Sequence, residues 1–207
     1  MEKVEVEHRG LLTKEKFDEL SLLLKEKGKF FGEKKRFSLI FSPSREEESY
    51  ELNRSPIDLK VRITNGKVEL VLKYGSWSGN DARKEFLFSI EPKKMEEIVE
   101  FLFILGYYFR VLQATTTKLY LYNEVEFALV KVPGWGYYFE AEIATNSNEI
   151  EKGNKKIIKE CQKLGIAALD DKNFCKMLDD LNNRPGHRFN LKKEKFFDIK
   201  KRFIDYF

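Results

Sequence analysis

Hydrophobic and polar residues alternate along several short segments of the chain, a pattern typical of β-strands with one buried face. Strands are predicted at 4–9, 35–41, 57–64, 67–74, 83–90 and, further along, at about 107–113, 117–122, 125–132 and 137–144. Asn65-Gly66 lies between two of these segments and predicts a tight hairpin. The polar stretches 42–56 and 75–82 are expected to be loops.

Other segments repeat their apolar residues at helical spacing. Helices are predicted from Thr13, as the cap, to 27, from Pro92 to Gly106, from Asn146 or Ser147 to about Leu164, at 172–182 and at 191–206. The expected strands come in hairpin-like runs that helices interrupt. This order predicts an α+β fold with an antiparallel sheet.

On the polar face of the expected strands, acidic and basic residues occur together. Glu5, Glu7 and Arg9 alternate with Val4 and Val6, and other strands repeat the pattern. One interpretation is a sheet with helices on its apolar face and water on the charged one. The other is a barrel whose charged interior binds a divalent cation and a phosphate-rich anion, because burying charge without a partner is costly.

The composition argues against several classes of protein, including disulfide-rich and membrane-spanning ones. The chain has 207 residues, a net charge of +4, two cysteines and two histidines. Two cysteines cannot build a disulfide framework, and the small basic excess does not indicate nucleic acid as a partner. No apolar run is long enough for a membrane span, and the first residues do not resemble a signal peptide, so a cytoplasmic location without membrane attachment is expected.

Several segments, taken together, resemble the CYTH superfamily, also called triphosphate tunnel metalloenzymes. Glu5-Val6-Glu7-His8-Arg9 resembles its E-x-E-x-K signature, and Leu59-Lys60-Val61-Arg62 resembles its paired basic strand. Further resemblances, in the same order as in the family, are Val68–Lys73, Arg83-Lys84-Glu85, the stretch from Val125 to Glu142 with its Gly134-Trp135-Gly136 turn, Leu164-Gly165, and Asp171–Phe174.

The resemblance implies an α+β fold built on an antiparallel β-barrel, the triphosphate tunnel, with helices packed on its outside. It covers residues 1–182 as a CYTH-like tunnel domain. Residues 183–207 are predicted to form a basic amphipathic helical tail that docks on this domain, because Phe196, Ile199 and Phe203 share helical spacing.

The resemblance also implies roles for individual residues. The metal ligands for Mg²⁺ or Mn²⁺ would be Glu5, Glu7, Glu140 and Glu142, with Glu85 as a helper. The groups that bind the triphosphate would be Arg9, Lys60, Arg62, Lys73, Arg83, Lys118 and Lys172. Lys73 is also the candidate for proton transfer, if its surroundings lower its pKa.

The chain departs from the family pattern at several positions. Arg9 replaces the signature lysine, and an arginine cannot act as a base. Thr115-Thr116-Thr117-Lys118 replaces most of a basic K-x-R pair, and Val130 stands in place of an aspartate. These differences remove phosphate contacts and an acid.

Three functions are compatible with these residues. The first is a metal-dependent phosphohydrolase acting on a small molecule that contains a triphosphate, either inorganic or organic. The second is an adenylate cyclase of the class IV type. The third, favoured by the departures, is a protein that binds triphosphate, nucleotide or RNA ends without catalysis. The sequence does not identify the substrate, the metal or the oligomeric state.

Overall fold

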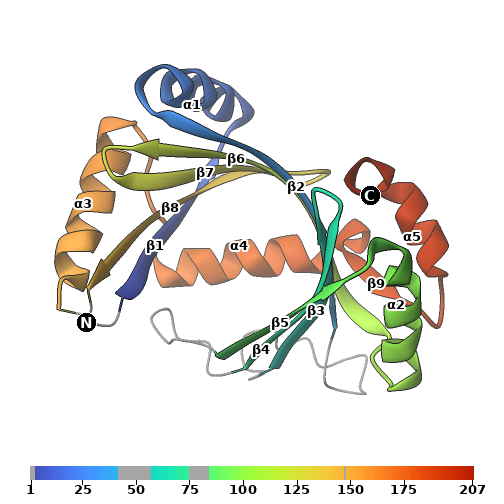
Figure 1. Cartoon of the computed structure of the whole chain (residues 1–207). Coiled ribbons are helices and arrows are strands. Elements are labelled where there is room, and N and C mark those ends of the chain that lie inside the picture. Colours follow the sequence, from blue (N-terminus) through green and yellow to red (C-terminus); the bar gives the residue numbers. More distant parts are fainter. Residues whose placement is uncertain (1–2, 42–56, 75–83, 147) are drawn as a thin grey trace. The chain divides into compact units, whose positions relative to one another are not determined.

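The computed structural model describes residues 3–41, 57–74, 84–146 and 148–207 (Figure 1). The loops expected at 42–56 and 75–82 lie outside the described residues. The strands are β1 (Lys3–Leu12), β2 (Lys29–Phe41), β3 (Ile57–Thr64), β4 (Lys67–Tyr74), β5 (Lys84–Ile90), β6 (Phe109–Tyr122), β7 (Val125–Val132), β8 (Gly136–Asn146) and β9 (Arg188–Asn190). The helices are α1 (Lys14–Lys27), α2 (Met95–Ile104), α3 (Ile150–Lys163), α4 (Asp171–Asn183) and α5 (Phe196–Arg202).

The strands hydrogen-bond in the order β1-β8-β7-β6-β2-β3-β4-β5, and β9 pairs with β6. Every pair whose register is known is antiparallel. The chain forms two compact units: Met1–Lys34 with Thr115–Leu181, and Lys35–Ala114 with Asn182–Phe207. The α+β class, the antiparallel sheet and the helices packed on its apolar side are therefore confirmed.

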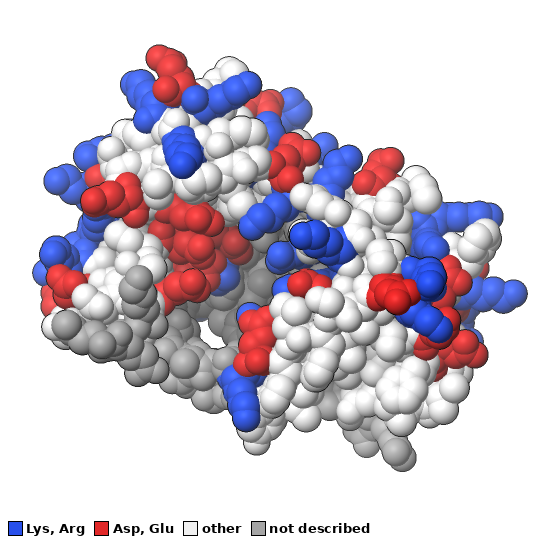
Figure 2. Space-filling model, viewed as in Figure 1, with Lys and Arg blue, Asp and Glu red and all other residues white. Residues whose placement is uncertain are grey.

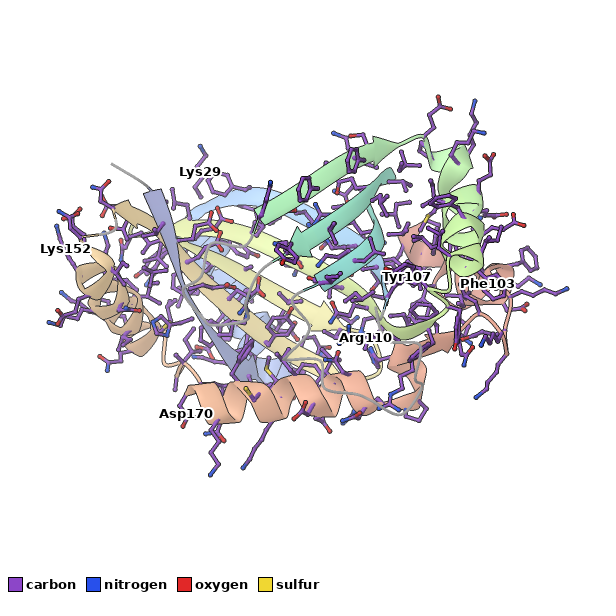
Figure 3. The ribbon with its side chains drawn as sticks, turned by 90° about the horizontal axis from the view of Figure 1, so that it is seen from below. Lys29, Phe103, Tyr107, Arg110, Lys152 and Asp170 are labelled. Carbon is purple, nitrogen blue, oxygen red and sulfur yellow. The ribbon has the colours of Figure 1, made fainter. Side chains whose placement is uncertain are left out.

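The core of the first unit lies between its strands and the helices α1 and α3. Val6 of β1 and Phe139 of β8 pack there with Leu20 of α1 and Ile157 of α3, and all four side chains are buried. The same strands have a second apolar contact on their other side, where Leu181 of α4 meets a smaller cluster that includes Val130. Helix α4 begins at a capping carboxylate, since Asp170 accepts a hydrogen bond from the Asn173 backbone N–H at 2.7 Å (Figure 3).

The core of the second unit lies under α2 and the C-terminal segment. Phe37, Leu39 and Val61 are fully buried there against Leu102 of α2 and Ile199 of α5. The ring of Phe37 packs on those of Phe203 and Phe207, with centroids 5.4 and 4.9 Å apart. The tail is therefore an integral part of the second unit.

Two sequence-based predictions about elements are wrong. The strands predicted at 107–113 and 117–122 are parts of one strand, β6, because Thr115 and Thr116 between them are β-branched and no turn residue interrupts the chain there. The helix expected at 191–206 is shorter, and the strand β9 precedes it. The Asn190 side chain accepts a hydrogen bond from the Lys192 backbone N–H and fixes a turn there.

The cap predicted at Asn146 or Ser147 is also wrong, because α3 begins after Glu149 and its first turn has no side-chain cap. The cap at Thr13 and the hairpin at Asn65-Gly66 are confirmed. Thr13 accepts a hydrogen bond from the Lys16 backbone N–H, and the Gly28 N–H bonds to the Leu24 carbonyl at the other end of α1. Asn65 and Gly66 both have positive φ, at 47° and 80°, as the tight hairpin requires. Among the described residues, no helix has the length and apolar character needed to cross a bilayer.

Gly10 of β1 provides a test of packing in the first unit. A Cβ atom at this position would lie 2.3 Å from the Ala167 carbonyl oxygen and 2.4 Å from the Phe139 ring. We expect Gly10→Ala to lower the free energy of unfolding by about 2–3 kcal/mol, because backbone and core must shift to make room. Urea denaturation followed by circular dichroism measures this change.

Gly186→Ala is the matched control for this substitution. A Cβ atom there would meet nothing within 4 Å, so its effect should stay within about 0.5 kcal/mol. Equal stabilities of the Gly10 variant and the wild type would contradict the close packing described for β1.

Candidate functional site

Carboxylates gather on the side of the first unit's strands that faces away from α1 and α3. In the pairing of β1 with β8, Glu7 lies opposite Glu142, and Arg9 lies opposite Glu140. Residues directly opposite in an antiparallel pair share a face. Figure 2 shows the resulting acidic patch over β1 and β8. The predicted grouping of these side chains therefore occurs, and Glu5 has the same parity on β1.

A fifth carboxylate, which the sequence analysis did not predict, joins this group. Glu126 of β7 lies directly opposite Glu142, so that Glu7, Glu142 and Glu126 stand in line across three strands. The sequence does contain a signal for this pairing. If the hairpin turn is centred on Gly134, positions at equal distance on either side of it pair, and these include 126 and 142. We call this group the acidic face, and it consists of Glu5, Glu7, Glu126, Glu140 and Glu142 together with Arg9.

Arg9 is the cation of the acidic face. Its Nη2 lies 2.6 Å from a carboxylate oxygen of Glu7, and its Nε lies 3.0 Å from Oε1 of Glu140. The guanidinium also stands over the Phe174 ring of α4, 5.1 Å from its centroid. The Arg9 carbonyl accepts a hydrogen bond from the Leu169 N–H at 2.7 Å. These contacts fix the guanidinium between two strands.

The acidic face holds more negative charge than Arg9 neutralises. Burial raises the pKa of Glu7 to about 7, and the charges of Glu140 and Glu142 add to this effect while Arg9 opposes it. Burial, followed by the charges of Glu126 and Glu5, raises the pKa of Glu142 to about 7. Both shifts have the same origin, which is a carboxylate that lacks water and has like-charged neighbours.

The residue types of the acidic face fit a hard divalent cation. Mg²⁺ and Mn²⁺ prefer carboxylate oxygens, and the surplus negative charge would be relieved by a cation. Within the described ranges, however, no three acidic, histidine or cysteine side chains already converge as metal ligands. The carboxylates are therefore of the chemical type that binds a divalent cation, but in this structure they are arranged around the Arg9 guanidinium.

The second unit carries a different charged face, on strands β3, β4 and β5. Here each predicted basic residue forms an ion pair: Lys60 with Asp58 at 2.9 Å, Arg62 with Glu69 at 2.6 Å and Lys73 with Glu85 at 3.2 Å. We call these six residues the ion-paired face. The structure thus places Glu85 beside Lys73, and Arg83 lies outside the described residues.

Burial distinguishes the lysines of this face. Burial lowers the pKa of Lys60, an effect that the Asp58 carboxylate opposes. The side chain of Lys60 is 16% exposed, against 35% for Lys73, the candidate for proton transfer. Lys60 is therefore the more buried of these two lysines.

Two of the predicted phosphate-binding residues lie apart from the acidic face. Lys118 of β6 is opposite Leu129, a core residue, and its Nζ stands over the Phe17 ring of α1 at 5.4 Å. Strand alternation thus directs it to the helix-covered side. Lys172 is exposed on α4, about 200° around the helix from Phe174 at 3.6 residues per turn.

Comparison with known proteins supports the fold. Neither a family model nor a curated protein matches the sequence. Among solved structures, the PH1819 protein from Pyrococcus horikoshii OT3 is 22% identical, with a TM-score of 0.63 over 85% of this chain and 98% of that protein.

Two further solved structures carry functional names. A candidate adenylate cyclase from Vibrio parahaemolyticus is 13% identical, with a TM-score of 0.60 over 86% of this chain and 99% of its own. The candidate adenylyl cyclase HpAC1 from Hippeastrum, described as having a dominant triphosphatase activity, is 16% identical, with a TM-score of 0.58 over 89% and 98%. These likenesses show the fold and are consistent with the resemblance to the CYTH superfamily.

The raised pKa values predict how stability depends on pH. Between pH 4.5 and about 7 the folded protein keeps protons on Glu7 and Glu142 that the unfolded chain releases. The free energy of unfolding of the metal-free protein should therefore fall as pH rises through this window. Glu142→Gln should flatten the curve by on the order of 1 kcal/mol, because water screens a half-buried carboxyl.

Urea denaturation in EDTA at several pH values measures this effect. Glu151→Gln is the matched control, since the Glu151 side chain is 83% exposed on α3. Its curve should run parallel to that of the wild type. A parallel curve for Glu142→Gln would show that the acidic face does not carry the expected charge surplus.

Proposed function

We propose that this protein is a divalent-metal-dependent phosphohydrolase that acts on inorganic or organic triphosphates. The observation that carries the proposal is the row of carboxylates Glu7, Glu142 and Glu126 across three neighbouring strands. Half-buried carboxylates in such a row repel one another, so a fold keeps them at a cost that a bound cation would offset. The ion-paired face of the second unit would supply groups that bind phosphate.

The carboxylates of the acidic face would hold the cation. Glu7, Glu140 and Glu142 are the first candidates, with Glu5 and Glu126 completing the donor set. A divalent cation bound there would neutralise phosphoryl charge and orient the attacking water. Arg9 would stay charged throughout, because a guanidinium does not lose its proton in proteins, and it can donate hydrogen bonds to a phosphoryl oxygen.

The ion-paired face would bind the phosphates. Lys60, Arg62 and Lys73 are each held by one carboxylate in the absence of substrate. A phosphate oxygen can replace that carboxylate, so binding exchanges one charged partner for another instead of desolvating a free cation. Arg62 is suited to bidentate contact, whereas the two lysines provide point charges.

Hydrolysis makes the smaller demand on the protein. It requires water as the acceptor, whereas cyclisation of ATP requires the nucleoside hydroxyl to be held for attack. The description of the Hippeastrum structure, a candidate cyclase with a dominant triphosphatase activity, shows that hydrolysis can prevail on this fold. This comparison supports triphosphate hydrolysis ahead of cyclase activity here.

A second function, triphosphate binding without turnover, is favoured by one observation. Arg9 already bridges Glu7 and Glu140, and no three acidic side chains of the described segments converge as ligands. A protein that binds anions with its own cations would need no metal. The two functions differ in their response to EDTA.

The hydrolase proposal is tested by phosphate release from inorganic triphosphate, ATP and thiamine triphosphate, with Mg²⁺ or Mn²⁺. Glu140→Gln combined with Glu142→Gln should reduce release by more than about 100-fold, because outer-shell partners of metal ligands alone are worth about 10–100-fold. Glu151→Gln, on the exposed side of α3, should retain wild-type activity. EDTA should abolish release.

Other results assign other functions. Wild-type activity of the double variant would exclude the carboxylates as metal ligands. Formation of cyclic AMP and pyrophosphate from ATP would identify a cyclase. Tight triphosphate binding that EDTA leaves unchanged, with no phosphate released, would establish the binding function.

A further inference from the structure

Arg110 of the second unit is a buried cation that lacks an acceptor of its own. It lies in β6, opposite Phe189 of β9, and is 5% exposed (Figure 3). Its guanidinium forms no hydrogen bond or ion pair with any part of the chain that the structure describes. Arginine presents five N–H donors, and a buried arginine almost always satisfies them. Its environment therefore calls for an acceptor.

The neighbouring arginine shows the usual solution. Arg188 pairs with Val111 in the same ladder, one position along from Arg110. Its Nε donates to the Asn182 carbonyl oxygen at 3.1 Å, and its Nη2 donates to the Asn183 side chain. The two arginines occupy successive positions of the ladder and therefore lie on opposite faces of it. The half-buried Arg188 has partners, whereas the more deeply buried Arg110 forms no hydrogen bond or ion pair with the described residues.

The backbone at Arg110 is held in an uncommon conformation. Its φ of 154° lies in a region that residues with a side chain rarely adopt. The pairing of β6 with β9 maintains it, together with the hydrogen bond from the Leu191 N–H to the Tyr108 carbonyl at 2.7 Å. Such conformations persist only where the surrounding structure enforces them, and they are frequent at ligand-binding sites.

The charge that acts on Arg110 comes from a carboxylate that already has a partner. The acid that acts on it is Asp58, which opposes the lowering of the arginine's pKa by burial. Asp58 is already the partner of Lys60 at 2.9 Å, and its cross-strand neighbour Lys73 pairs with Glu85. The carboxylate that acts on Arg110 is thus already in contact with Lys60.

We infer that Arg110 binds a phosphoryl oxygen of the triphosphate, beside Lys60, in an oxyanion site of the second unit. This inference rests on the proposed function and adds a residue to it. A tetrahedral oxyanion matches the fork of a guanidinium and would give its N–H groups an acceptor.

The test compares Arg110→Met with Arg188→Met in the full-length protein, with inorganic triphosphate as the probe. Without the anion, the unfolding temperature of Arg110→Met should equal or exceed that of the wild type, because a buried charge without an acceptor is replaced by an apolar chain. The increase in unfolding temperature that triphosphate gives the wild type should be lost, with binding weakened at least about tenfold.

Arg188→Met should show the opposite behaviour. Its unfolding temperature should fall without the anion, because the Asn182 carbonyl loses its donor. Its affinity for triphosphate should stay at the wild-type value. Arg110→Lys, which keeps the charge and loses the fork, should bind with intermediate affinity and provides a folded variant if the methionine variant is unstable.

A purely structural role for Arg110 would overturn the inference. In that case Arg110→Met would unfold at a lower temperature without the anion and would bind triphosphate with unchanged affinity by calorimetry. Failure of the inference is separable from failure of the proposed function. Unchanged KM in Arg110→Met, with metal-dependent phosphate release intact, removes only Arg110, whereas Arg110-dependent binding without any release removes only the hydrolase.

Discussion

The repulsion among half-buried carboxylates is the constraint on which the first unit depends. Strand alternation and register place Glu7, Glu142 and Glu126 in line, and the apolar core on the opposite side prevents any strand from turning over. Among the described residues, Arg9 offsets this charge directly through ion pairs with Glu7 and Glu140. Helix α4 supports Arg9 through the Phe174 ring, and the preceding segment supports its backbone through Leu169. These tertiary contacts thus hold in place the cation that offsets the charge of the carboxylates.

The second unit has basic residues to neutralise, and it does so with ion pairs. It pairs Lys60, Arg62 and Lys73 each with one acid, so that its ion-paired face is close to neutral. A surplus of negative charge favours a cation, whereas a face of exchangeable ion pairs favours an anion that displaces the internal acids. The two faces therefore differ in the ligand they select, although both use half-buried side chains on antiparallel strands.

Local sequence signals predicted what depends on neighbouring residues. The cap at Thr13, the hairpin at Asn65-Gly66 and the shared parity of Glu5 and Glu7 follow from spacing alone. Glu126 and Lys118 depend on register between strands, which the unbroken length of β6 and the turn at Gly134 decide. The burial of Arg110 depends on β9, a strand of three residues with no sequence signal of its own.

The replacement of a signature lysine by Arg9 changes how the acidic face meets a cation. A lysine can lose its proton when a metal approaches, whereas a guanidinium remains charged. A divalent cation that binds Glu7 and Glu140 must therefore compete with Arg9 for the same oxygens, which lie 2.6 and 3.0 Å from the guanidinium nitrogens. The stacking of Arg9 on Phe174 would oppose its displacement, so contacts of α4 would affect the affinity for such a cation. The residue that offsets the charge of the acidic face would thus also set how strongly a cation must bind to replace it.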